Sequence, residues 1–269
     1  MNSIKNTARL AGFLLLLIAV LAPFSMLYLP SILIAPGDAA TTASNVMASD
    51  GLFRLGVVVD SVVILLEIVL IGILYVLLRP VSRTLALVAA FARLAMTTVM
   101  AVNLFNSLGV LLLLSGAGYL TVFEPNQLDA LVLLFLNLHE SGIYIWQVFL
   151  GLHLIVLGYL VFKSGYFPRI LGVLLMVACS GYLMDSLGIL LPGSEVVSIV
   201  APVFLVATVI GEVSFTFWLL IKGVNVEQWE KRALESPRAQ PMPTGVEDDL
   251  SDPRGEAIQA SQPKRKEYS

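Results

Sequence analysis

The chain has 269 residues, of which 58% are hydrophobic and only 13% are charged, and its mean hydropathy is +0.89. Soluble domains carry about a quarter charged residues, so this composition cannot cover a water-facing surface. The net charge of −3 argues against a nucleic-acid partner. One cysteine, Cys179, and two histidines, His139 and His153, exclude an internal disulfide, a cysteine-based zinc site and a three-histidine metal site. We therefore expect no metal and no cofactor.

Six apolar runs are long enough to span a membrane, which takes about 20 mostly apolar residues. In chain order they cover residues 9–29, 53–78, 84–114, 142–162, 168–191 and 197–221. A further apolar run, 128–138, is too short to span alone. It either extends the fourth helix outward, with a kink at Gly142, or lies at the membrane interface. The pattern predicts an all-α, polytopic transmembrane bundle of about six helices.

The placement of Lys and Arg predicts the orientation of this bundle, because cytoplasmic loops are enriched in both. Alternate ends of the spans carry seven of them: Lys5, Arg9, Arg79, Arg83, Lys163, Arg169 and Lys222. The opposite loops carry acidic residues instead, with Arg54 as the nearby exception: Glu124, Asp129, Glu140 and Glu195. Both termini are therefore expected to be cytoplasmic.

The composition changes after the last apolar run. Residues 1–223 are predicted to form the transmembrane helical domain. Residues 224–269 are rich in Pro and charged types and are predicted to form a cytoplasmic, largely disordered tail, with a short helical extension over 226–235. Such a tail could bind a cytoplasmic partner, whereas the remainder of the chain has the lipid bilayer as its partner.

Eight polar residues lie within the predicted spans, where an ionisable group costs a few kcal/mol on insertion scales and needs a partner, a cavity or a function. Helical rise places four of them about 14–16 Å from the cytoplasmic end: Glu67, Arg93, His153 and Glu212. Four others lie about 23–28 Å from that end: Asp60, Asn103, Gln147 and Asp185. We predict an ion pair between Glu67 and Arg93, whose helices are joined by a short turn. His153 and Glu212 are expected to extend the pair into a network.

Three functions compete for these residues. A small-solute or proton-coupled transporter would use the polar network as its pathway. A structural or sensory membrane protein would use it to clamp the helices together. An intramembrane enzyme is disfavoured, because the sequence lacks a Gly-x-Ser-x-Gly elbow, a His-Glu-x-x-His motif and a phosphate loop, and no catalytic residues can be assigned.

Several motifs together resemble the domain-of-unknown-function 4386 family of bacterial membrane proteins. They are Ala35-Pro36-Gly37-Asp38-Ala39-Ala40, Ser49-Asp50-Gly51-Leu52-Phe53-Arg54-Leu55-Gly56, Tyr75-Val76-Leu77-Leu78-Arg79-Pro80-Val81-Ser82-Arg83, Phe123-Glu124-Pro125, Leu152-His153, Lys163-Ser164-Gly165, Pro168-Arg169-Ile170-Leu171-Gly172, Gly181-Tyr182-Leu183-Met184-Asp185-Ser186 and Gly211-Glu212. The resemblance covers roughly residues 8–223. It implies a multi-pass protein of the bacterial cytoplasmic membrane and brings no activity with it.

Overall fold

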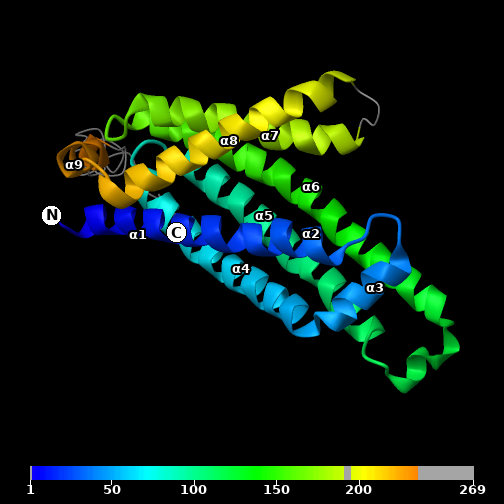
Figure 1. The fold of residues 1–269 in the computed structure, drawn as a ribbon. Coiled ribbons are helices and arrows are strands. Elements are labelled where there is room, and N and C mark those ends of the chain that lie inside the picture. The colour runs from blue at the N-terminus through cyan, green and yellow to red at the C-terminus, as the bar shows by residue number, and fades with distance from the viewer. Residues whose placement is uncertain (1, 191–194, 236–269) are drawn as a thin grey trace, which may run out of the picture.

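The computed structural model describes residues 2–190 and 195–235 and contains helices but no strand within them. The elements in chain order are α1 (Asn2–Pro23), the π-helix η1 (Phe24–Tyr28), α2 (Leu29–Leu33), α3 (Ala39–Ala48), α4 (Asp50–Leu78), α5 (Arg83–Leu113), the 3-10 helix η2 (Gly118–Val122), α6 (Pro125–Ser164), α7 (Arg169–Leu190), α8 (Glu195–Ile221) and α9 (Val226–Glu235) (Figure 1). Most of the predicted tail, residues 236–269, lies outside the described residues.

Five helices are long and apolar enough to cross a membrane, and a bent pair raises the number to as many as six. The first is the continuous run Ser3–Leu33, which joins α1, η1 and α2. The bent pair joins the end of α8 to α9. The prediction of an all-α polytopic bundle of about six helices is therefore confirmed.

Helix α6 is much longer than a bilayer requires. It runs without a break over 40 residues, about 60 Å at the usual rise, whereas the hydrocarbon core is about 30 Å thick. The apolar run 128–138 is thus the outward extension of the fourth span and not a separate interfacial helix. A capping box at Glu124 and Gln127 starts the helix, and Gly165 in the left-handed conformation ends it.

Six long helical segments form a closed ring. Each packs against the next one along the chain, in the order α1, α4, α5, α6, α7 and α8, and α8 packs back against α1 (Figure 1). Two glycine contacts show how closely the helices approach. A Cβ atom on Gly158 of α6 would lie 2.7 Å from the carbonyl oxygen of Gly172 on α7, and one on Gly12 of α1 would lie 2.4 Å from the backbone nitrogen of Leu220 on α8. Small residues commonly permit such contacts between membrane helices.

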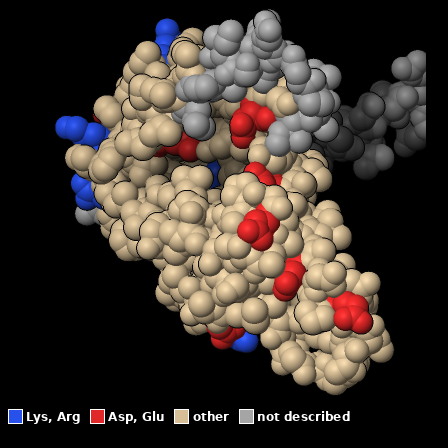
Figure 2. All heavy atoms as spheres, turned by 45° about the vertical axis from the view of Figure 1, so that its right-hand side comes forward, with Lys and Arg blue, Asp and Glu red and all other residues tan. Residues whose placement is uncertain are grey.

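One end of the ring gathers the chain segments that carry the basic residues. Arg9 of α1 donates to the carbonyl of Ile221 at the end of α8, and the backbone N–H of Asn225 donates to the carbonyl of Tyr166 in the α6–α7 turn. The N-terminus and α9 lie at this same end in Figure 1, and Lys and Arg atoms gather toward one side in Figure 2. We call it the basic end.

Helix α9 closes part of the basic end. It is a separate helix and not an extension of the last span, since the chain turns by 100° between them, at Gly223 with φ of 68°. The indole N–H of Trp229 donates to the carbonyl oxygen of Leu77, 2.9 Å away. The first residues of the predicted tail are therefore packed against the bundle.

Candidate functional site

The centre of the ring contains the predicted ion pair between α4 and α5. The guanidinium of Arg93 forms a bidentate salt bridge with the carboxylate of Glu67, with Nε 2.6 Å from Oε2 and Nη2 3.1 Å from Oε1. Their side chains are only 6% and 8% exposed. Two parallel, charge-assisted hydrogen bonds of this kind fix both position and orientation.

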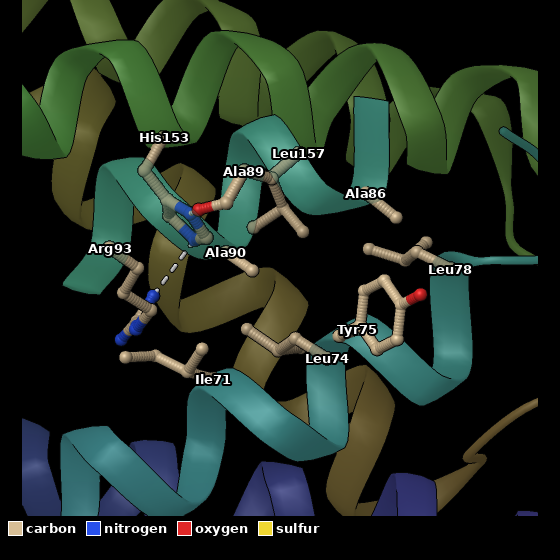
Figure 3. Close-up of a pocket in the computed structure, with 10 residues that line it drawn as sticks. All are labelled: Ile71, Leu74, Tyr75, Leu78, Ala86, Ala89, Ala90, Arg93, His153 and Leu157. Carbon is tan, nitrogen blue, oxygen red and sulfur yellow. Dashed lines mark hydrogen bonds between the residues drawn. The ribbon is translucent and has the colours of Figure 1, made fainter. Parts of the chain in front are cut away.

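His153 on α6 extends the pair to a third helix. Its Nε2 lies 3.0 Å from Nη1 of Arg93, and its Nδ1 lies 2.8 Å from the carbonyl oxygen of Ala89 (Figure 3). A carbonyl can only accept and a guanidinium can only donate. The ring proton therefore sits on Nδ1, the ring is neutral, and Nε2 accepts from Arg93. The three residues join α4, α5 and α6, and we call them the central triad.

A small cavity borders the central triad on the side toward the basic end. It lies between α4, α5 and α6 and has a volume of about 10 Å³, which is room for roughly one water molecule. Apart from Arg93 and His153, its lining is mostly apolar, with Tyr75, Leu78 and Ala86 nearer the basic end (Figure 3). A cavity of this size holds no organic cofactor. Within the described ranges, no three His, Cys, Asp or Glu side chains are placed to hold a metal ion.

Glu212 does not join the central triad by direct contact. It lies on α8 and accepts a hydrogen bond of 3.1 Å from the hydroxyl of Tyr182 on α7. Among the described residues it has no ion-pair partner, and its side chain is partly exposed. The predicted network is thus a tight triad with a neighbouring carboxylate and tyrosine.

The four residues predicted to lie deeper, about 23–28 Å from the cytoplasmic end, form three separate clusters. Gln147 on α6 donates to Asp185 on α7 over 2.8 Å and accepts from Ser186 over 2.9 Å. Asn103 on α5 donates to the carbonyl of His139 on α6 over 2.8 Å. Asp60 on α4 contacts the hydroxyl of Ser25 in η1, and no described contact joins it to the other two clusters.

Sequence reasoning missed three side chains that complete these contacts. Tyr182 and Ser186 stand in the same motif as Asp185, so their helical spacing was the available signal. Ser25 is flanked by Pro23 and Pro30, and these two prolines in one span were the signal for an irregular turn there.

Taken together, the ring of apolar helices and the ionisable groups at its centre define an integral membrane protein with a polar interior. The chain belongs to the family described as domain of unknown function DUF4386, whose family model matches residues 10–223. It is similar to an uncharacterized protein of Archaeoglobus fulgidus, with 31% identity over 166 residues that make up 62% of this chain and 82% of the relative. No solved structure shows a significant match.

Proposed function

We propose that this protein is a small-solute or proton-coupled transporter of the bacterial cytoplasmic membrane, in which Glu212 and Asp185 belong to the pathway. The observation that carries the proposal is that each carboxylate has a neutral hydrogen-bond donor, Tyr182 or Gln147, and no cationic partner in the described part of the chain. Carboxylates inside a membrane are costly and rare, and proton and solute pathways are among the functions that they mark. A purely structural role does not require an unbalanced charge.

The central triad has a different part in this proposal. The salt bridge between Glu67 and Arg93 and the two contacts of His153 leave these groups engaged with one another. Such an arrangement holds α4, α5 and α6 together while the groups on α7 and α8 exchange protons or bind solute. In Figure 2, acidic side chains lie around a small hollow that has basic atoms at its base.

A proton-flux measurement tests the transport proposal. Purified protein is reconstituted into liposomes that contain a pH-sensitive dye, and a potassium gradient with valinomycin supplies the driving potential. The wild type should move protons faster than protein-free liposomes, and Glu212→Gln or Asp185→Asn should abolish the difference. Glu140→Gln is the matched control, since Glu140 is an exposed carboxylate on α6. Flux in Glu212→Gln and Asp185→Asn equal to that of the wild type would refute the pathway.

A structural or sensory role is the second candidate, and one observation favours it. The central triad is closely packed, because its adjoining cavity has room for only about one water molecule. In this alternative all buried polar residues clamp the helices, and α9 with the following tail presents a surface to a cytoplasmic partner. Deleting residues 236–269 would then remove the cellular phenotype, whereas Glu212→Gln would leave it intact.

A further inference from the structure

The first span is interrupted by a π-helical turn at Phe24–Tyr28. The backbone N–H of Leu29 donates to the carbonyl of Phe24, five residues back, and not to that of Ser25. Pro30, the residue five after Ser25, has no N–H to donate. The regular helical donors are thus withheld from the Ser25 carbonyl. Such π-turns are rare in helices and occur frequently at functional sites.

A buried acidic residue faces this turn. The carboxylate of Asp60 on α4 contacts the Ser25 hydroxyl, and the two residues are 7% and 9% exposed. Within the described ranges, no Lys, Arg or His side chain forms an ion pair with Asp60, and the ring of His139 on α6 contacts Ser107 and the Asn103 carbonyl on α5. The other two acidic residues of α4, Glu67 and Asp50, pair with Arg93 and Arg54, and Asp38 at the start of α3 contacts Thr41.

The Ser25 hydroxyl contacts two oxygen atoms but has only one proton to donate. The Ser25 Oγ atom lies 3.2 Å from the carbonyl oxygen of Ala22 and also contacts Oδ1 of Asp60. Both neighbours are acceptors when Asp60 is ionised, but a hydroxyl has one proton. Two full hydrogen bonds form when the Asp60 carboxyl carries a proton and donates it to Ser25 while Ser25 donates to Ala22, whereas with Asp60 ionised the single Ser25 proton is shared between the two acceptors.

We propose that Asp60 and Ser25 form a reversible proton-binding site built into the π-helical turn of the first span. When the proton leaves, the Ser25 hydroxyl donates to the carboxylate instead of accepting from the carboxylic acid, so the contact with α4 remains and the hydrogen bond to the Ala22 carbonyl is weakened. Protonation thereby strengthens the hydrogen bonding within the π-helical turn and reverses the donor of its bond to α4. This site goes beyond the transport proposal and stands without it.

Infrared difference spectroscopy of the protein in lipid bilayers tests the site directly. On a step from acidic to alkaline pH, the wild type should lose a C=O stretching band of a protonated carboxylic acid. The part of this band that belongs to Asp60 should be missing in Asp60→Asn. It should shift to higher frequency in Ser25→Ala, because the acid loses its acceptor. Asp50→Asn, at the exposed start of α4, should match the wild type.

Two results would overturn the proposal. The first is an Asp60→Asn spectrum that equals the wild-type spectrum, which would mean that Asp60 does not change its protonation state in the pH range measured. The second is an unshifted band in Ser25→Ala, which decides the matter even if Asp60→Asn fails to fold. Since no flux is measured, a failed transport assay leaves this outcome unaffected.

Discussion

Tyr166 and Trp229 donate hydrogen bonds to the same acceptor, the carbonyl oxygen of Leu77, from 2.8 and 2.9 Å. Tyr166 lies in the α6–α7 turn and Trp229 in α9. One backbone oxygen near the end of α4 therefore links α4 to both of these segments at the basic end. Burial raises the pKa of Tyr166, so its hydroxyl remains protonated and a donor at neutral pH.

The first prediction concerns this shared acceptor. Tyr166→Phe and Trp229→Phe should each lower the free energy of unfolding by about 1 kcal/mol, the usual net value of one hydrogen bond. The double variant should cost more than the sum, because the Leu77 carbonyl then loses both donors. Thermal unfolding in detergent measures the three values. Strict additivity would show that the two bonds are independent of one another.

The second prediction concerns the ion pair of the central triad. Arg93→Leu leaves the Glu67 carboxylate buried and unpaired, which should cost about 3–5 kcal/mol. Arg93→Leu combined with Glu67→Gln should recover much of that loss. The matched control is the exposed pair Asp50–Arg54, whose removal should cost far less, because water screens exposed ion pairs. A double variant as unstable as the sum of its single variants would argue against a direct pair.

The third prediction concerns the tautomer of His153. Nitrogen NMR spectra of ¹⁵N-histidine-labelled protein at neutral pH should show a protonated Nδ1 and an unprotonated Nε2, as its contacts with Ala89 and Arg93 require. His139→Gln assigns the signals, because the chain has only these two histidines. A doubly protonated His153 would contradict the arrangement of the triad.

The fourth prediction concerns the contact between α6 and α7. Gly158→Ala should destabilise the protein by about 1–3 kcal/mol, since the new methyl group meets the Gly172 carbonyl and the helices must separate. Gly72→Ala is the control, because nothing lies within 4 Å of its added Cβ atom. That variant should be neutral or gain up to about 1 kcal/mol from helix propensity. Equal effects at the two glycines would refute the close contact.

The fifth prediction concerns the pH dependence of α3. Asp38 caps this helix, and the backbone N–H of Thr41, followed by the Thr41 hydroxyl, holds the pKa of its carboxyl below the usual 3.8. The cap is fully formed above pH 3.8 and is lost as the pH falls through the lower folded-state pKa. The protection of the α3 amides against hydrogen exchange, relative to the intrinsic rate at each pH, should fall in that window, and Asp38→Asn should remove this fall.

Depth along a helix could be predicted from the sequence, whereas rotation about the helix axis could not. The pair Glu67–Arg93 followed from matched depths and a short turn, and the structure contains it. Glu212 lies at a similar predicted depth, yet α8 presents it to Tyr182 and not to Arg93. Apolar residues surround each span on nearly all sides, so the sequence carries little information on which face points inward.

The contact between Ser25 and Asp60 was harder to predict, because it depends on the irregular turn. A π-turn shifts the face that its residues present, and only Pro23 and Pro30 marked the place in the sequence. The bonds to Leu77 were also unpredictable, since a backbone acceptor at a helix end carries no sequence signature.

The order of the helices around the ring has a consequence for biosynthesis. Each span packs against the span synthesised just before it, so most neighbours meet as the chain leaves the ribosome. The exception is the seam where Gly12 of α1 meets Leu220 of α8. The side of α1 that packs against α8 therefore has no protein partner until α8 is inserted. A chain truncated before α8 cannot close the ring.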